Sequence, residues 1–88
     1  MLVKFTSLFN KDVSGILNIK LIQTIEDTIE DVKFAESVFS IRNLKKLKGY
    51  KNHFRIRIGN YRIGLFIDNN IAEFSRFLHR KEIYRYFP

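Results

Sequence analysis

Hydrophobic and polar positions in the first half of the chain predict one strand followed by two helical segments. Residues 2–6 place Val3 and Phe5 on one face, which is typical of a short strand. Ser7 can cap a helical turn after this strand, and Gly15 interrupts that turn. Farther on, apolar residues recur at three- and four-residue steps: Ile22, Ile25, Ile29 and Val32. They share one stripe of an amphipathic helix whose other side is acidic, so we expect this stripe in the core.

The second half of the chain shows the period of two that is typical of β-strands. Residues 54–58 alternate strictly between apolar and basic side chains, which puts Arg55 and Arg57 on one face. Gly59-Asn60 is a two-residue hairpin signal, and residues 61–67 continue the alternation as a second strand. After the turn at residues 68–70, a third strand is expected over 71–78. Consecutive hairpins of this kind imply an antiparallel meander.

The remaining segments are less regular. Residues 33–53 contain isolated apolar positions, with loops indicated at Gly49 and Asn52. The tail 82–88 fits a helical turn or an extended segment. The predicted order is β-α-α-β-β-β with a short C-terminal tail. This is an α+β fold in which two N-terminal helices pack on an antiparallel sheet and the first strand joins that sheet across the helices. One domain spans residues 1–88.

Composition limits the class of protein. The chain has 88 residues, 45% of them hydrophobic, and its nine phenylalanines and four tyrosines favour a folded domain with a modest core. It contains no apolar run of about 18 residues, as a membrane span requires, and the N-terminus lacks signal-peptide features. Because there is no cysteine, disulfides, zinc–thiolate sites and thiol chemistry are excluded, and the cytoplasm is the expected compartment.

Charge is distributed unevenly along the chain. The formal net charge is +7. Residues 1–44 hold five basic and six acidic side chains and sum to −1, whereas residues 45–88 hold eleven and three and sum to +8. Most of the aromatic residues lie in the same basic half. This segregation favours a polyanionic partner, nucleic acid above all, over a merely solvated basic surface.

Three arginines give the basic half its candidate chemistry. Across the predicted hairpin, Arg57 and Arg62 should lie close together, and Arg55 shares their face. Like charges opposed on a sheet cost stability, so the arrangement favours an anion, and guanidinium groups suit phosphate because they bind it in a bidentate manner. The alternative is a solvated outer sheet face. Gly64 on this face would leave space for a nucleic-acid backbone or base to approach.

The segment after the last strand adds cations and aromatic rings to this face. His79, Arg80, Tyr84 and Tyr86 show the pattern in which a ring stacks on a base while cations hold phosphates. Two histidines without cysteine give no metal-ligand spacing, and the glycines form no phosphate-loop motif, so we expect neither metal nor cofactor.

Several segments of the chain together resemble a known family. Leu44–Gly49 and Phe54–Arg62 are similar to the central signature of the RelE/ParE toxin superfamily, and His79–Arg85 is similar to its closing motif. Phe9–Val13 also fits the family's first helix, so the resemblance touches the whole chain. The Gly-Asn-Tyr-Arg and His-Arg-Lys-Glu-Ile-Tyr pieces are fairly specific in this order. The family's compact α/β fold matches the predicted order of elements.

The resemblance implies the toxin of a bacterial type II toxin–antitoxin system, an mRNA interferase that represses translation. RelE-like members are endoribonucleases that cut mRNA in the ribosomal A site without metal. The 2′-hydroxyl attacks the adjacent phosphodiester and leaves a 2′,3′-cyclic phosphate and a 5′-hydroxyl. ParE-like members share much of the pattern, so a non-nuclease toxin that inhibits DNA gyrase by protein binding is the alternative. In either case we expect a cognate antitoxin that covers the basic half. The toxin alone would be a monomer or dimer, and it would form a hetero-oligomer with the antitoxin, with no membrane partner.

Motif positions within the resemblance imply roles for single residues. Arg62 matches the family's transition-state arginine, Arg80 the arginine near the leaving group, and Tyr84 the tyrosine that stacks on a base. Arg57 completes the arginine set of the catalytic site. Other basic residues are expected to bind RNA phosphates: Arg55, Lys45, Lys46, Lys48 and Lys51.

The resemblance does not assign a general base in this site. Arg55 and Arg57 stand where RelE itself has lysines, and an arginine does not readily accept a proton. His79, with an unperturbed pKa of about 6.5, is a candidate for the base and could equally be structural. His53 is a weaker candidate because it falls in a predicted loop.

Overall fold

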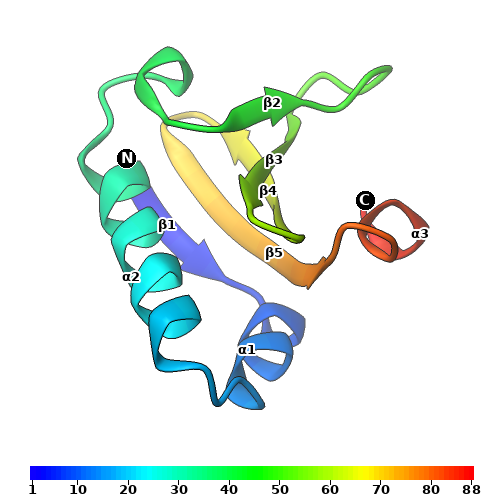
Figure 1. Cartoon of the computed structure of the whole chain (residues 1–88). Helices are drawn as coiled ribbons and strands as arrows, with labels where there is room; N and C mark the ends of the chain where they lie inside the picture. The colour runs from blue at the N-terminus through cyan, green and yellow to red at the C-terminus, as the bar shows by residue number, and fades with distance from the viewer.

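A computed structural model of residues 1–88 shows one sheet with helices on both of its sides (Figure 1). The segments with alternating polarity form the strands, and the segments with helical periodicity form the helices. The elements in chain order are β1 (Leu2–Phe5), α1 (Ser7–Ser14), α2 (Ile19–Phe34), a 3₁₀ turn (Val38–Ser40), β2 (Leu44–Lys46), β3 (His53–Ile58), β4 (Tyr61–Asp68), β5 (Ile71–His79) and α3 (Ile83–Tyr86). The predicted α+β class is confirmed, and the tail of the chain forms a helical turn.

The sheet differs from the predicted one in two details. Its strand order is β1-β5-β4-β3-β2, and β1 pairs with β5 in parallel, so the sheet is mixed rather than wholly antiparallel. The first strand does join the meander, as expected. A further strand, β2, pairs with β3 and makes the order β-α-α-β-β-β-β. It was missed because three residues are too few to show a period, and exposed Lys45 and Lys46 are typical of an edge strand.

Turns and one bulge fix the register of the hairpins. Gly59 has a φ of +56° at the β3–β4 turn, and Asn69 and Asn70 both have positive φ at the β4–β5 turn, as tight hairpins require. In β5 the pairing passes from Phe74 to Arg76, so the residue between them bulges out of the ladder. Because of this bulge, side chains three residues apart, those of Phe74 and Phe77, are both buried.

Helix starts are set by side-chain caps. The Thr6 hydroxyl accepts a hydrogen bond from the Phe9 backbone N–H at 3.0 Å, so Thr6 rather than Ser7 caps α1. Asn18 caps α2 in the same way, with its side-chain oxygen 3.0 Å from the backbone nitrogen of Leu21. The long helix therefore begins at Ile19.

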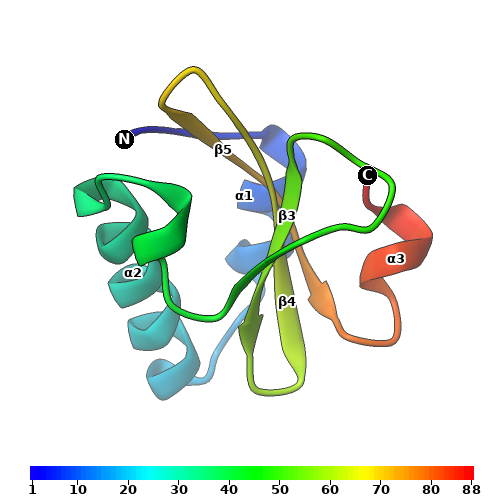
Figure 2. The same cartoon turned by 90° about the horizontal axis from the view of Figure 1, so that it is seen from above.

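The main hydrophobic core lies between α2 and one face of the sheet. Ile25 and Val32 of the predicted stripe are buried there, and Ile29 packs against them. Ile22, at the open end of the stripe, is 37% exposed. In Figure 2 the strands lie between α2 on one side and α3 on the other. None of the helices is long and apolar enough to cross a membrane.

A carboxylate on α1 ties this helix to β5. Strand β1 pairs only with the first part of β5, and α1 packs beside the remainder. Asp12 accepts hydrogen bonds there from Nε of Arg76 at 2.8 Å, from its Nη2 at 3.1 Å, and from the backbone N–H of Phe77 at 3.0 Å. This hydrogen bonding raises the pKa of Arg76 above its ordinary value, against a smaller opposing effect of burial.

We expect Asp12→Ala to lower the free energy of unfolding by about 3 kcal/mol, because it leaves a largely buried guanidinium and a backbone N–H without their acceptor. Chemical denaturation measures the change. Asp31→Ala removes an exposed carboxylate of α2 and should change stability by less than about 0.5 kcal/mol. Equal losses in the two variants would contradict a special role for Asp12.

Candidate nucleic-acid interface

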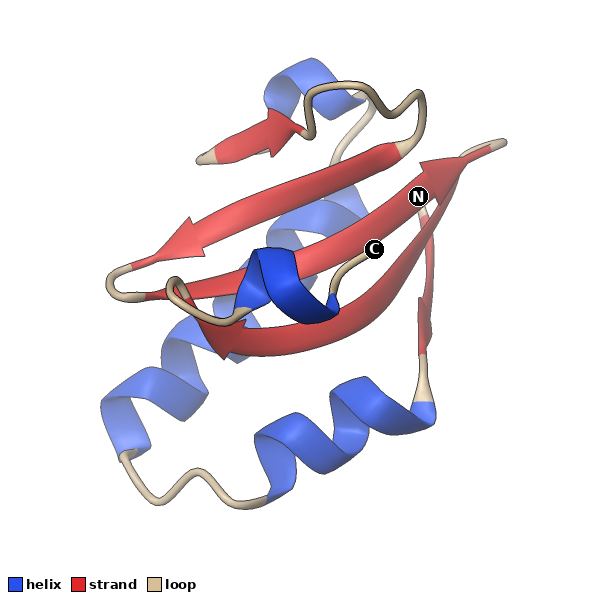
Figure 3. Ribbon diagram, turned by 90° about the vertical axis from the view of Figure 1, so that its right-hand side faces the viewer, coloured by secondary structure: helices blue, strands red, loops and turns tan.

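The face of the sheet opposite α2 carries the arginines that the alternation predicts. In the β3–β4 ladder, Arg57 pairs directly with Arg62, and Arg55 pairs with Gly64. Residues that pair directly point to the same side of a sheet, so all three guanidinium groups emerge from one face. Figure 3 looks onto this face, with α3 in front of the strands.

Arg62 is the fixed centre of this cluster. Its Nη1 donates hydrogen bonds to the backbone oxygens of Gly59 and Tyr61, both at 2.9 Å, which hold the guanidinium at the turn of the β3–β4 hairpin. Burial lowers the pKa of Arg62, and the charge of Arg55 lowers it further. Arg57 and Arg80 act in the same direction, and Tyr84 opposes them. The structure therefore brings four arginines and one tyrosine within electrostatic reach of one another.

Residues after β5 reach this cluster through a backbone anchor. The N–H of Arg80 donates to the carbonyl of Asn60 at 2.8 Å, which ties the end of β5 to the β3–β4 hairpin. The Arg80 side chain is exposed, and Tyr84 on α3 is 60% exposed. Both side chains are thus open to a ligand on the arginine face.

A basic pocket of about 420 Å³ adjoins the arginines between β2 and the C-terminal segment. Arg55 and Tyr84 contribute to its lining, together with three of the predicted lysines: Lys45, Lys46 and Lys48. Lys51 is exposed outside the lining. Tyr50 also lines the pocket and was missed by sequence reasoning, although its place between lysines 48 and 51 repeats the aromatic-beside-cation signal.

The space expected beside Gly64 is already filled. A Cβ atom at position 64 would lie 2.6 Å from Cδ2 of Phe87, so the ring of Phe87 packs directly on the glycine backbone. The prediction that a nucleic acid approaches there is wrong, because the chain's own C-terminus occupies the site.

His79 does not join the arginines. It pairs with Tyr61 on the opposite face of the sheet, where the two rings meet edge to face at 5.5 Å between centroids. The bulge between Phe74 and Arg76 reverses the alternation and turns His79 away. Its Nδ1 accepts a hydrogen bond from the Lys81 N–H at 3.2 Å, so a neutral His79 carries its proton on Nε2.

His53 begins strand β3 and does not lie in a loop. Its ring packs against the rings of Tyr50, Phe66 and Phe87, with centroids 5.0 to 5.6 Å apart. It shares the arginine face but sits at the end of β3 away from the Arg57–Arg62 pair. No group of three or more His, Asp or Glu side chains is placed to hold a metal ion.

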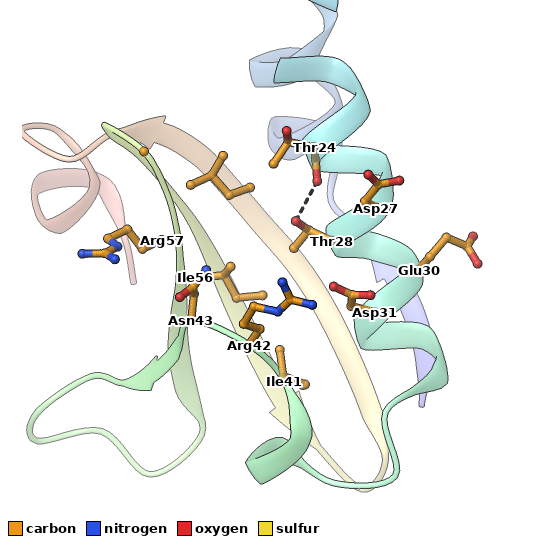
Figure 4. A pocket seen from close by; sticks show the side chains of 12 residues that line it. Thr24, Asp27, Thr28, Glu30, Asp31, Ile41, Arg42, Asn43, Ile56 and Arg57 are labelled. Atoms are coloured by element: carbon orange, nitrogen blue, oxygen red, sulfur yellow. Dashed lines mark hydrogen bonds between the residues drawn. The ribbon is translucent and has the colours of Figure 1, made fainter. Parts of the chain in front are cut away.

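A larger cleft of about 570 Å³ lies between α2 and β3 and borders the interface at Arg57 (Figure 4). Its α2 wall carries Asp27, Glu30 and Asp31, which would repel an anion. Figure 4 shows Arg42 reaching into the cleft toward α2, whereas Arg57 points away from it. The cationic surface and the acidic helix therefore belong to different sides of the molecule.

Several known proteins are similar to this chain in sequence and in fold. The family model for the ParE toxin of the type II toxin–antitoxin system parDE matches residues 3–84. Toxin RelE3 of Methanocaldococcus jannaschii is 40% identical over 89 residues, which cover 100% of both chains. This chain belongs to the RelE/ParE superfamily of type II toxin–antitoxin toxins.

Solved structures agree with this assignment. A chain in the crystal structure of the RelB-RelE antitoxin-toxin complex from Methanococcus jannaschii superposes with a TM-score of 0.80 at 39% identity, covering 97% of this chain and 99% of that chain. A chain of the toxin-antitoxin complex RelBE2 from Mycobacterium tuberculosis gives a TM-score of 0.60 at 25% identity, covering 90% and 96%.

If the arginine face binds phosphate, an anion should stabilise the protein. We expect inorganic phosphate to raise Tm by about 4 °C or more over chloride at matched ionic strength, which corresponds to about 1 kcal/mol in a domain of this size. Arg57→Gln should remove most of this rise, because it removes half of the opposed pair. Arg42→Gln, on the other side of the molecule, should retain it. An undiminished rise in Arg57→Gln would rule out this anion site. Thermal unfolding followed by circular dichroism measures both.

Proposed function

We propose that this protein is a ribosome-dependent mRNA endoribonuclease and the toxin of a type II toxin–antitoxin module. The observation that carries the proposal is the opposed pair of Arg57 and Arg62, with Arg55, Arg80 and Tyr84 around it. A pair of like charges held face to face by the register of a sheet costs stability. A bound phosphodiester relieves that cost, and its cleavage develops still more negative charge for the arginines to stabilise.

The proposed reaction is an internal transfer within the RNA. The 2′-hydroxyl gives up its proton as its oxygen bonds to phosphorus, the bond from phosphorus to the 5′-oxygen breaks, and the leaving 5′-oxygen takes up a proton. Both protons are exchanged with solvent, and the products are a 2′,3′-cyclic phosphate and a 5′-hydroxyl. The pentavalent transition state gathers negative charge on its oxygens. Guanidinium groups already held in place stabilise this charge without reorganising, and this is often the largest single contribution to catalysis. Arg62, fixed by two backbone carbonyls, is the group best prepared for it.

The other residues take roles that follow from their positions. Arg80 stands at the end of β5 and would contact the leaving 5′-oxygen. The exposed ring of Tyr84 would stack on a base, and the lysines of the adjoining pocket would follow the RNA backbone. Because arginines stay protonated, they act here through charge and hydrogen bonds and not by accepting a proton.

The ribosome and an antitoxin complete the proposal. His79 faces the other side of the sheet, so we assign the acceleration to charge stabilisation and to the ordering of the mRNA codon by the ribosome. The relatives described above include toxins crystallised with their antitoxins. We expect an acidic antitoxin segment to cover the arginine face, because such a segment would compete with RNA for the same cations.

Induction of the protein in bacteria, followed by mapping of mRNA 5′ ends, tests this function. The wild type should create new 5′ ends within translated codons, and Arg62→Ala should lower cleavage about 100-fold or more. Arg42→Gln, which lies outside the interface, should cleave like the wild type. Intact mRNA together with accumulated gyrase–DNA cleavage complexes would overturn the nuclease and indicate the ParE-like alternative.

His79 should be dispensable for cleavage. His79→Asn keeps an acceptor for the Lys81 N–H but has no group that titrates near neutral pH. We expect its cleavage rate on ribosomes to stay within about threefold of the wild type, with the same pH profile between about pH 6 and 8. A loss of about 100-fold, with disappearance of one limb of the wild-type pH profile, would make His79 the general base.

A further inference from the structure

The last residues of the chain lie across the arginine face of the sheet and form a small core of their own. Ile83 is completely buried and Phe87 is 5% exposed. Together with Leu47 they make a cluster separate from the main core, and Leu78 packs against it. Figure 3 shows α3 in front of the sheet, where it contacts β4 and β5. Because this cluster is separate from the main core, we expect the segment to loosen before the main fold does.

A single close contact, between the ring of Phe87 and the backbone of Gly64, holds this segment on the sheet. We call this contact the seat. Three ring carbons of Phe87 lie within 2.6 to 2.8 Å of where a Cβ at position 64 would be, closer than any real Cβ atom tolerates. The φ of Gly64 is not positive, so its backbone conformation does not call for glycine. What requires glycine at position 64 is therefore the ring of Phe87.

The contact of Phe87 with Gly64 is needed to fix the position of α3, because α3 is too short to be stable by itself. A helix of four residues is far too short to be stable alone. The N–H of Phe87 donates to the carbonyl of Ile83 at 2.8 Å, so the buried anchor and the helical turn form one unit. Tyr84 lies within that turn, mostly exposed, and lines the basic pocket together with Arg55 and Phe87.

We infer that Phe87, seated on Gly64, is a positioning residue that places Tyr84 over the arginine cluster. This inference rests on the proposed function for its effect on cleavage, but the seat itself does not. Without the ring, α3 loses one of its two buried anchors and the tyrosine ring no longer has a fixed orientation toward bound RNA. Phe87 is 5% exposed and forms part of the floor of the basic pocket, and we expect its effect on cleavage to pass through Tyr84.

The position of α3 can be followed without any activity, because the chain contains no tryptophan. Tyr84→Trp introduces a single fluorescent reporter. In this background, Phe87→Ala and Gly64→Ala should each lower its anisotropy and increase quenching by acrylamide at least twofold. Phe39→Ala removes a phenylalanine that is 96% exposed, and Gly15→Ala adds a methyl group where nothing lies within 4 Å, so both serve as matched controls without effect.

Cleavage of ribosome-bound mRNA by the native chain tests the role of the seat. Phe87→Ala should lower kcat about tenfold, comparable to the loss of a base-stacking ring, with circular dichroism unchanged. Phe87→Leu should recover most of the rate. Gly64→Ala should resemble Phe87→Ala, and the double variant should be no worse than either, since both changes break one contact. In the Tyr84→Ala background, Phe87→Ala should have no further effect.

The outcomes separate the seat from the proposed function. Unchanged anisotropy and quenching in Phe87→Ala and Gly64→Ala would overturn the seat. Multiplicative losses of kcat in the Tyr84→Ala, Phe87→Ala double variant would overturn its action through Tyr84. If the wild type leaves ribosomal mRNA intact while the reporter loosens as described, the proposed nuclease fails and the seat stands.

Discussion

The pairing register of β3 with β4 is the constraint on which the rest of the molecule depends. It sets Ile56 opposite Ile63 on one face and Arg57 opposite Arg62 on the other. A slip by one residue would exchange the two faces and put arginines into the core. Burial of each isoleucine stabilises the fold by about 1.5–3 kcal/mol, whereas a pair of opposed surface charges destabilises it by about 0.2–1 kcal/mol. Core packing therefore determines the register, and Arg57 and Arg62 stay paired in spite of their repulsion. The fold thereby maintains a repulsion that a bound phosphate would relieve.

The two sides of the sheet serve different purposes as a consequence. One side is covered by α2 and contains the main core. The other is shared between the chain's own C-terminal segment and the exposed cations of the hairpin end. By covering the part of this face beside Gly64, the C-terminal segment leaves the Arg57–Arg62 end open and carries Tyr84 next to it. The acidic residues of α2 lie on the other side of the sheet. The uneven distribution of charge along the sequence thus becomes an uneven distribution of charge between the two sides of the molecule.

Strict alternation allowed the arginine face to be predicted from the sequence, because within β3 and β4 a period of two decides which side chains share a side. His79 was expected beside the arginines because it follows the last predicted strand, and the structure contradicts this expectation. Residues 74 and 79 lie five apart, which places His79 opposite the core in a regular strand, but the bulge after Phe74 reverses the alternation. Phe77, an aromatic three residues from Phe74, was the signal that could have revealed it. The packing of Phe87 on Gly64 could not be predicted, because it joins residues far apart in the chain whose pattern shows no period.

Attack by the 2′-oxygen can be tested with an mRNA that is bound to purified ribosomes and carries a single 2′-deoxynucleotide at the scissile position. We expect the all-ribose mRNA to be cut to a 2′,3′-cyclic phosphate and the 2′-deoxy mRNA to stay intact, because its nucleophile is missing. Cleavage of both mRNAs at the same rate would contradict an attack by the 2′-oxygen. An intact all-ribose mRNA at saturating protein would contradict a phosphodiester-cleaving role for the arginine face.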